Sequence, residues 1–170
     1  MAQPTHPPLQ ITQHWADLTD HLIEIIDALP DDKLNWSPKP EMWNFKGIIF
    51  HIIGARVGWL EDVIRDGEGM PDYIHLGQTK EGLKQQLRLS WERFERFLSD
   101  PDKLDAVYEP PAGPAPIPPY DRTYLDPPVF DGHWIAYHRM VHDIQHRGDL
   151  LGYLEQLGIE LPPGRRRRPF

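Results

Sequence analysis

Residues 133–154 read HWIAYHRMVHDIQHRGDLLGYL and carry most of the information about fold and chemistry. Apolar and aromatic residues recur in this stretch at the spacing of an amphipathic helix. Gly158 is a typical helix stop, and Pro162 follows shortly after it. We therefore expect a helix from about Asp131 to Leu157.

Three histidines, His138, His142 and His146, lie one turn apart on this predicted helix. Residues four positions apart are separated by about 40° around the helix axis, so His142 and His146 project to one face. The apolar or amphipathic residues close to that line are Ile135, Leu150, Tyr153 and Leu157. We therefore expect the pair to face inward. His138 is offset by about 80° from His146 and is expected to support a ligand or to line a pocket.

Three more helices are expected upstream, separated by proline and glycine. The first runs over about Leu9 to Leu29. The second follows a cap at Asn44 and runs over about Phe45 to Asp66, and the third runs from a cap at Thr79 to just before Pro101. Residues 101–130 form a long connection in which EPPAGPAPIPP, at 109–119, has six prolines, and this excludes a helix or a central strand. The sequence thus predicts an all-α fold, a four-helix bundle with a long proline-rich connection between helices three and four.

The composition and charge of the chain exclude several kinds of site and ligand. The chain has 170 residues, no cysteine and a formal charge of −8. One domain is expected over residues 1–160, followed by a basic tail at 161–170 that contains Arg165–Arg168. Without those four charges the rest carries −8 − 4 = −12, which argues against nucleic acid as the main ligand. The absence of cysteine excludes disulfides and metal–thiolate sites. No membrane-length apolar run and no signal-peptide pattern are present, so we expect a cytoplasmic protein without membrane contact.

A further histidine, His51, lies in the apolar stretch GIIFHIIGARVGW at 47–59. Its predicted helix face includes Gly47, Ala55 and Gly58, small residues that leave room for an ion, a water molecule or a ligand. One imidazole from this helix and two from the last helix can supply three metal ligands and leave positions open, as in catalytic sites. The alternative is that His51, His142 and His146 are hydrogen-bonded core residues without a metal.

At these residues the chain resembles the DinB/YfiT-like family. The resemblance rests on Trp43-Asn44 followed by His51 and Trp59, and on His142-x-x-x-His146-Arg147-Gly148 followed by a leucine-rich turn and Leu157-Gly158. The run DKLNWSPKPEMWN at 32–44 also matches, and the likeness covers roughly residues 9–160. It implies a metal-binding four-helix bundle.

The resemblance also implies details of the site and the assembly. The family's metal ligands fall on His51, His142 and His146, its ions are usually nickel or zinc, and its members commonly form homodimers. The exposed faces of the first and third helices are then candidate dimer contacts. The roles of two residues near the expected pocket stay open. Asp149 either accepts a ligand's second N–H or is a surface charge, and Arg147 either attracts an acidic substrate group or extends to solvent.

Two functions follow as hypotheses. The first is a metal-dependent enzyme acting on a small molecule, a thiol S-transferase resembling relatives that use mycothiol, bacillithiol or glutathione, or a hydrolase. No catalytic residue is assigned, because the carboxylates of the predicted second helix, Glu61 and Asp62, lie more than two turns from His51. The second is a non-catalytic, small-molecule-binding or stress-associated dimeric module. The remaining histidines are expected on the surface or in loops; they are His6, His14, His21, His75 and His133.

Overall fold

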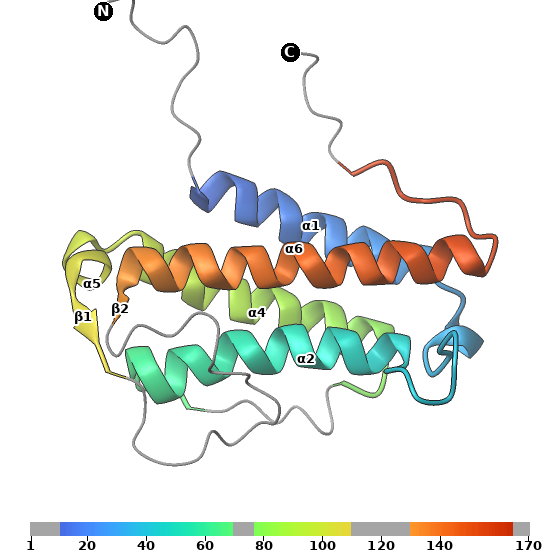
Figure 1. The fold of residues 1–170 in the computed structure, drawn as a ribbon, viewed down its shortest axis with the longest axis horizontal. Helices are drawn as coiled ribbons and strands as arrows, with labels where there is room; N and C mark the ends of the chain where they lie inside the picture. Colours follow the sequence, from blue (N-terminus) through green and yellow to red (C-terminus); the bar gives the residue numbers. More distant parts are fainter. Residues whose placement is uncertain (1–10, 70–76, 110–129, 165–170) are drawn as a thin grey trace, which may run out of the picture.

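Four long helices lie side by side in the computed structural model, which describes residues 11–69, 77–109 and 130–164. They are α1 (Ile11–Ala28), α2 (Phe45–Gly58), α4 (Lys80–Leu98) and α6 (Gly132–Gln156). Helices α1 and α6 run in one direction, and α2 and α4 run in the opposite direction (Figure 1). The predicted all-α, four-helix bundle is confirmed.

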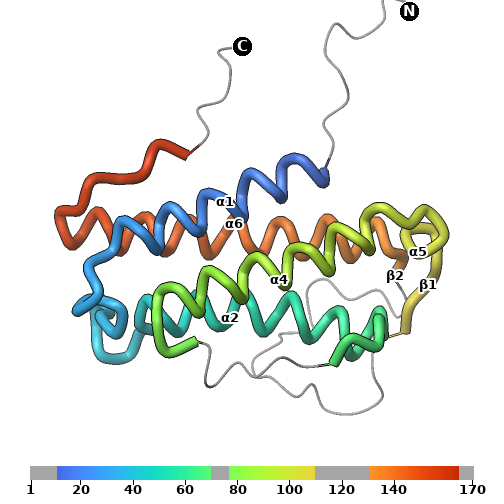
Figure 2. The backbone as a smooth tube through the Cα atoms, turned by 180° about the vertical axis from the view of Figure 1, so that it is seen from behind, coloured from blue at the N-terminus to red at the C-terminus, as the bar shows by residue number. Residues whose placement is uncertain are grey.

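Each helix packs against two others. Helix α1 contacts α4 and α6, and α2 contacts the same two helices, so the order around the bundle is α1, α4, α2, α6 (Figure 2). The apolar core forms two clusters along the bundle axis. One is centred on Ile26, Ile49 and Leu87, and the other on Trp15 and Phe94.

The helix ends are set by side chains that the sequence indicates. The Asn44 Oδ1 atom accepts the Gly47 N–H at 2.7 Å and caps α2, and Thr79 caps α4 in the same way. Gly158, with φ of +69°, follows the last turn of α6, where the left-handed conformation favours glycine.

The structure differs from the expected helices in two places. The second helix is not regular to Asp66: after Gly58 it continues as a π-helix, η2 (Trp59–Ile64). The region after Pro101 was expected to lack helix, but it contains α5 (Pro101–Asp105). Proline is well placed in a first helical turn, and the Asp100 carboxylate accepts backbone N–H groups there.

The connection into α6 is closely packed. A two-residue pairing of β1 (Val107–Tyr108) with β2 (Phe130–Asp131) is antiparallel and brings the chain back to α6. A Cβ atom on Gly132 would lie 2.4 Å from the Lys103 carbonyl oxygen, so only glycine fits where α6 meets α5. The described residues do not include the proline-rich stretch at 110–119, His6, His75 or the arginines at 165–168. None of the helices in the described part combines the length and apolarity needed to cross a membrane.

A buried polar layer separates the two apolar clusters. Arg56 of α2 and Asp143 of α6 are fully buried, and the Arg56 Nε atom donates to Asp143 Oδ2 at 2.8 Å. The Trp15 indole donates to the same oxygen at 2.7 Å. Arg56 also donates to the hydroxyls of Thr19 on α1 at 3.0 Å and Ser90 on α4 at 3.4 Å. All four helices therefore contribute to a single hydrogen-bonded layer.

Replacing Arg56 is expected to be severely destabilising. Arg56→Met leaves the Asp143 carboxylate buried without its closest charge partner, and breaking such a pair costs about 3–5 kcal/mol in free energy of unfolding. Thr19→Val removes only one acceptor and is expected to cost about 1–3 kcal/mol. Urea unfolding followed by circular dichroism measures both. Lys33→Met, which breaks the exposed 3.0 Å contact with Asp32, should cost less than about 1 kcal/mol. Equal losses in all three variants would contradict the assigned role of the polar layer.

Candidate metal centre

Three histidines from two helices meet at one flank of the bundle. His51 comes from α2, and His142 and His146 come from α6. The Nε2 atoms of His51 and His142 are 2.8 Å apart, and the ring centroid of His146 lies 4.8 Å from that of His51 and 4.5 Å from that of His142. One nitrogen from each ring can be chosen so that all three lie within 4.8 Å of one another. The structure thus brings together the three residues expected as ligands.

The charge state of these rings suits metal binding. Burial lowers the pKa of His51 to about 4, with a further contribution from His146. Burial also lowers the pKa of His142 to about 3, although its contact with Asp143 opposes the shift. Both rings are therefore neutral at physiological pH, and a neutral imidazole is the form that binds a metal ion. A set of three imidazole ligands fits a divalent ion such as zinc or nickel.

Carboxylates fix the orientation of the two histidines of α6. The His146 Nδ1 atom lies 2.9 Å from Asp149 Oδ2, and the His142 Nδ1 atom lies 3.3 Å from Asp143 Oδ1. A carboxylate in this position accepts a hydrogen bond from the Nδ1–H group and leaves the Nε2 lone pair free for a ligand role. Asp149 therefore combines the two roles between which the sequence did not decide. Its carboxylate contacts the His146 ring, and its side chain is also 48% exposed at the surface.

Asp143 is the important residue that the sequence analysis missed. It lies directly after His142, about 100° farther around the helix, and is fully buried. Burial raises its pKa, but the Arg56 guanidinium, the hydrogen bond with His142 and the nearby Arg139 together outweigh burial and lower the pKa of Asp143 to about 2. The carboxylate therefore stays ionised beside His142. The sequence does contain an indication of this residue. Arg56 is the only charged residue in the apolar stretch 47–59, and a buried charge requires a partner of opposite charge.

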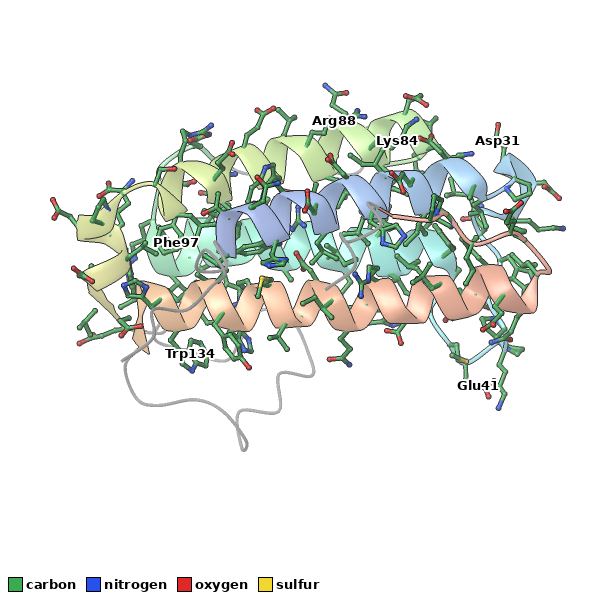
Figure 3. All side chains as sticks on the ribbon, turned by 90° about the horizontal axis from the view of Figure 1, so that it is seen from above. Asp31, Glu41, Lys84, Arg88, Phe97 and Trp134 are labelled. Carbon is green, nitrogen blue, oxygen red and sulfur yellow. The ribbon has the colours of Figure 1, made fainter. Side chains whose placement is uncertain are left out.

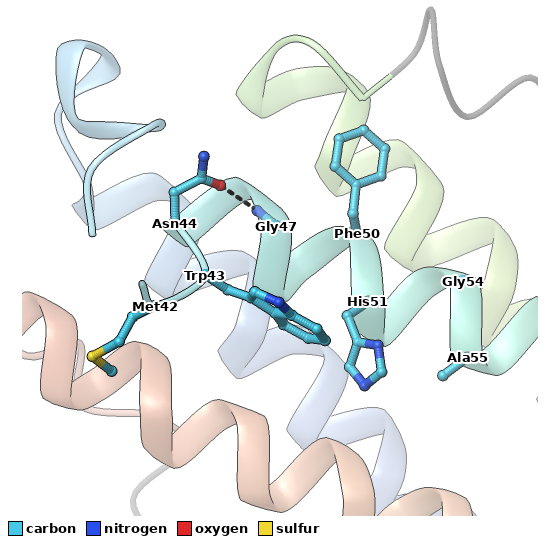
Figure 4. A pocket seen from close by; sticks show the side chains of 8 residues that line it. All are labelled: Met42, Trp43, Asn44, Gly47, Phe50, His51, Gly54 and Ala55. Atoms are coloured by element: carbon cyan, nitrogen blue, oxygen red, sulfur yellow. Dashed lines mark hydrogen bonds between the residues drawn. The ribbon is translucent and has the colours of Figure 1, made fainter. Parts of the chain in front are cut away.

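An open cavity of about 510 Å³ adjoins His51. Its described walls are formed by Met42, Trp43, Asn44, Gly47, Phe50, His51, Gly54 and Ala55. Figure 4 shows the indole of Trp43 beside the imidazole of His51, both on the side facing α6, with Phe50 pointing away from them. The Trp43 ring centroid is 4.6 Å from that of His51 and 6.4 Å from that of His146. Trp43 is 49% exposed, so one side of the histidine group has an aromatic wall open to solvent.

The other predicted pocket residues lie away from this group. His138 stacks on Trp134, with ring centroids 4.6 Å apart, and also contacts Trp59. Arg147 lies about 100° around α6 from His146. Glu61, considered as a base, pairs instead with Arg93 of α4.

Two other histidines sit far from the centre. His21 lies 3.3 Å from the Pro162 carbonyl oxygen, and His133 pairs with Asp105.

Fold and site together define a four-helix bundle with a three-histidine group that could hold a metal ion. A family model described as the DinB superfamily matches residues 10–150, and the chain belongs to this superfamily. A crystal structure of a DinB-like protein from Bacillus subtilis superimposes with a TM-score of 0.63 at 17% identity, over 91% of this chain and 96% of that one. A DinB-like protein from Bacillus cereus gives 0.62 at 15% identity, over 89% and 93%. No curated protein matches the chain.

Removing a ligand should abolish metal binding. Protein purified without a histidine tag and loaded with zinc or nickel is expected to hold a near-stoichiometric ion, and His51→Ala or His142→Ala to hold almost none, because two imidazoles remain. Metal content by mass spectrometry after gel filtration measures this. His138→Ala removes a nearby histidine outside the group and should retain the metal. Retention of metal by both ligand variants would refute the assignment.

The carboxylate beside His146 should tune affinity without being a ligand. Asp149→Ala is expected to weaken zinc or nickel binding by about 10–100-fold, since the ring loses the group that orients it. Competition with a chromophoric chelator gives the ratio. Gln145→Ala, a neighbouring exposed change, serves as the matched control. An unchanged affinity in Asp149→Ala would show that this contact plays no part in binding.

Proposed function

We propose that this chain is a metal-dependent enzyme acting on a small molecule, with a thiol S-transferase-like activity. The observation that carries the proposal is the position of the three imidazoles, which lie close together beside an open cavity that His51 lines. A divalent ion held by His51, His142 and His146 would supply Lewis acidity that favours the thiolate form of a low-molecular-weight thiol. Since the chain has no cysteine, the thiol comes from solution.

The chain's own residues would bind and orient the reactants. Met42, Trp43 and Phe50 give the cavity an apolar wall beside His51, suited to the hydrocarbon part of a small substrate. Asp143 and Asp149 hold the imidazoles of α6 in position. The ligands are therefore set before a substrate arrives.

A thiol reaction is favoured over hydrolysis by the state of the nearby carboxylates. Asp143 is fully buried and paired with Arg56, Asp149 contacts His146, and Glu61 pairs with Arg93. Within the described residues these groups are already engaged, whereas hydrolysis calls for a general base. A thiol that ionises at the metal centre depends less on a general base.

A second function, a non-catalytic binding module, is supported by a specific contact. The 2.8 Å contact between the Nε2 atoms of His51 and His142 has the length of an N–H···N hydrogen bond, which gives one nitrogen of each ring a partner without a metal. In that case the cavity would bind a small molecule, and the histidines would stabilise the packing of α2 on α6.

Stability and turnover together separate the two functions. Free ion at a hundred times its Kd should stabilise the fold by about 2.7 kcal/mol, so dialysis against a chelator should lower the Tm of the loaded protein. Mass spectrometry should then show glutathione, bacillithiol or mycothiol joined to an electrophilic substrate by the loaded protein and not by His142→Ala. An unchanged Tm in protein shown to have lost its metal would favour the binding module. Loaded protein that consumes none of the three thiols would refute the transferase proposal.

A further inference from the structure

Trp43 is the most exposed of the six tryptophans, all of which lie within the described residues. It is 49% exposed, whereas Trp15 and Trp91 are 0% and 9% exposed. A large aromatic side chain stabilises a fold by leaving water, and Trp43 forgoes much of that gain. Its indole instead forms part of the wall of the cavity beside His51. An aromatic surface is therefore available to a ligand in this cavity.

Contacts of the main chain hold Trp43 in place from both sides. Its carbonyl oxygen accepts a hydrogen bond from the Tyr153 hydroxyl of α6 at 2.8 Å. The next residue, Asn44, caps α2, and the Phe45 N–H donates to the Trp36 carbonyl oxygen at 2.9 Å. None of these bonds uses the indole, so they persist when the side chain is changed. They also present the ring from a fixed point, which lowers the entropic cost of binding a ligand against it.

The surroundings of the indole are aromatic and uncharged. Its plane makes an angle of 60° with the ring of His51 and 26° with the ring of His146. The described residues of the cavity wall include no Asp, Glu, Lys or Arg. A charged group placed against this wall would lose water without gaining a partner of opposite charge. A flat uncharged ring can instead stack on Trp43 or meet it edge to face.

A second aromatic group on α6 lies elsewhere along the helix and provides a comparison. Trp134 stacks on His138 with 9° between the ring planes, and it is not among the described residues of the cavity wall. Figure 3 shows Trp134 near one end of α6, and Glu41, two residues before Trp43, near the other end. The two tryptophans can therefore be varied independently.

We propose that Trp43 selects the substrate of this site by stacking against an uncharged, planar aromatic group that the substrate carries. The proposal rests on the proposed function, since the thiol would react at an electrophilic carbon of that group. With an aryl halide the step is a substitution. The thiol sulfur forms a bond to the ring carbon, the halide leaves with the electron pair of its bond to that carbon, and the thiol proton passes to solvent. Trp43 makes and breaks no bond, and it determines which electrophile is held beside His51.

Binding of 2-naphthol to the metal-free full chain tests the stacking contact separately from catalysis. Isothermal titration calorimetry should give a Kd about tenfold lower than for decahydro-2-naphthol, which has the same carbon skeleton but no flat ring. Trp43→Leu keeps an apolar side chain and removes the ring, so it should raise the Kd for 2-naphthol about tenfold. Trp43→Phe restores a ring and should recover most of the affinity.

Two controls accompany this measurement. Trp134→Leu removes a tryptophan outside the described cavity wall and should leave the Kd for 2-naphthol unchanged. Circular dichroism should show Trp43→Leu folded, because the main-chain contacts of Trp43 do not involve the indole. Equal affinity of the wild type for the two alcohols, or equal affinity of the wild type and Trp43→Leu for 2-naphthol, overturns the proposal.

A choice between two electrophiles connects the contact to turnover. The loaded protein and glutathione are supplied with 1-chloro-2,4-dinitrobenzene or with iodoacetamide, which has no ring. Trp43→Leu should lower the ratio of kcat/KM for the aromatic over the ringless electrophile about tenfold, mainly through KM. An unchanged ratio overturns the assignment of Trp43 as the residue that determines specificity. No reaction with either electrophile, together with ring-dependent binding of 2-naphthol, refutes the transferase function and supports the aromatic contact.

Discussion

The ion pair between Arg56 and Asp143 is the contact on which the rest of the structure depends. Each charge is removed from water, so each must be matched within the bundle, and the matching groups come from all four long helices. Asp143 divides its oxygens between two tasks. One accepts from Trp15 and Arg56, and the other faces the His142 imidazole. The rotation of α6 that satisfies the buried charge therefore also sets the direction of His142.

The polar layer is better understood as a source of specificity than of stability. Well-packed apolar side chains often replace a buried ion pair with no loss of stability. The two apolar clusters on either side, however, consist largely of aliphatic and aromatic residues that tolerate sliding of one helix along another. A guanidinium with fixed donor directions tolerates much less. We infer that the layer sets the helix register, and that the approach of His51 to the α6 histidines follows from that register.

The sequence predicted what depends on local spacing and missed what depends on distant pairing. Periodicity and caps at Asn44, Thr79 and Gly158 located the four helices, and the spacing of His142 and His146 placed both on one face. The role of Asp143 depends on Arg56, which is 87 positions away in the chain, so no local pattern could indicate it. The π-helix after Gly58 likewise has no local signal that we identified. That the three histidines hold a metal stays a prediction.

Helix α6 has two faces with separate roles, which explains why its sequence is not simply amphipathic. One face carries Asp143 and Leu150 into the core, and the other carries His142 and His146 toward His51 of α2. The face with His142 and His146 is intermediate in exposure. A small molecule can therefore reach these two rings, while buried Asp143 contacts His142 from the core side. Two of the three imidazoles lie on this helix, so the buried pairing of Asp143 with Arg56 also holds the spacing of the proposed metal ligands.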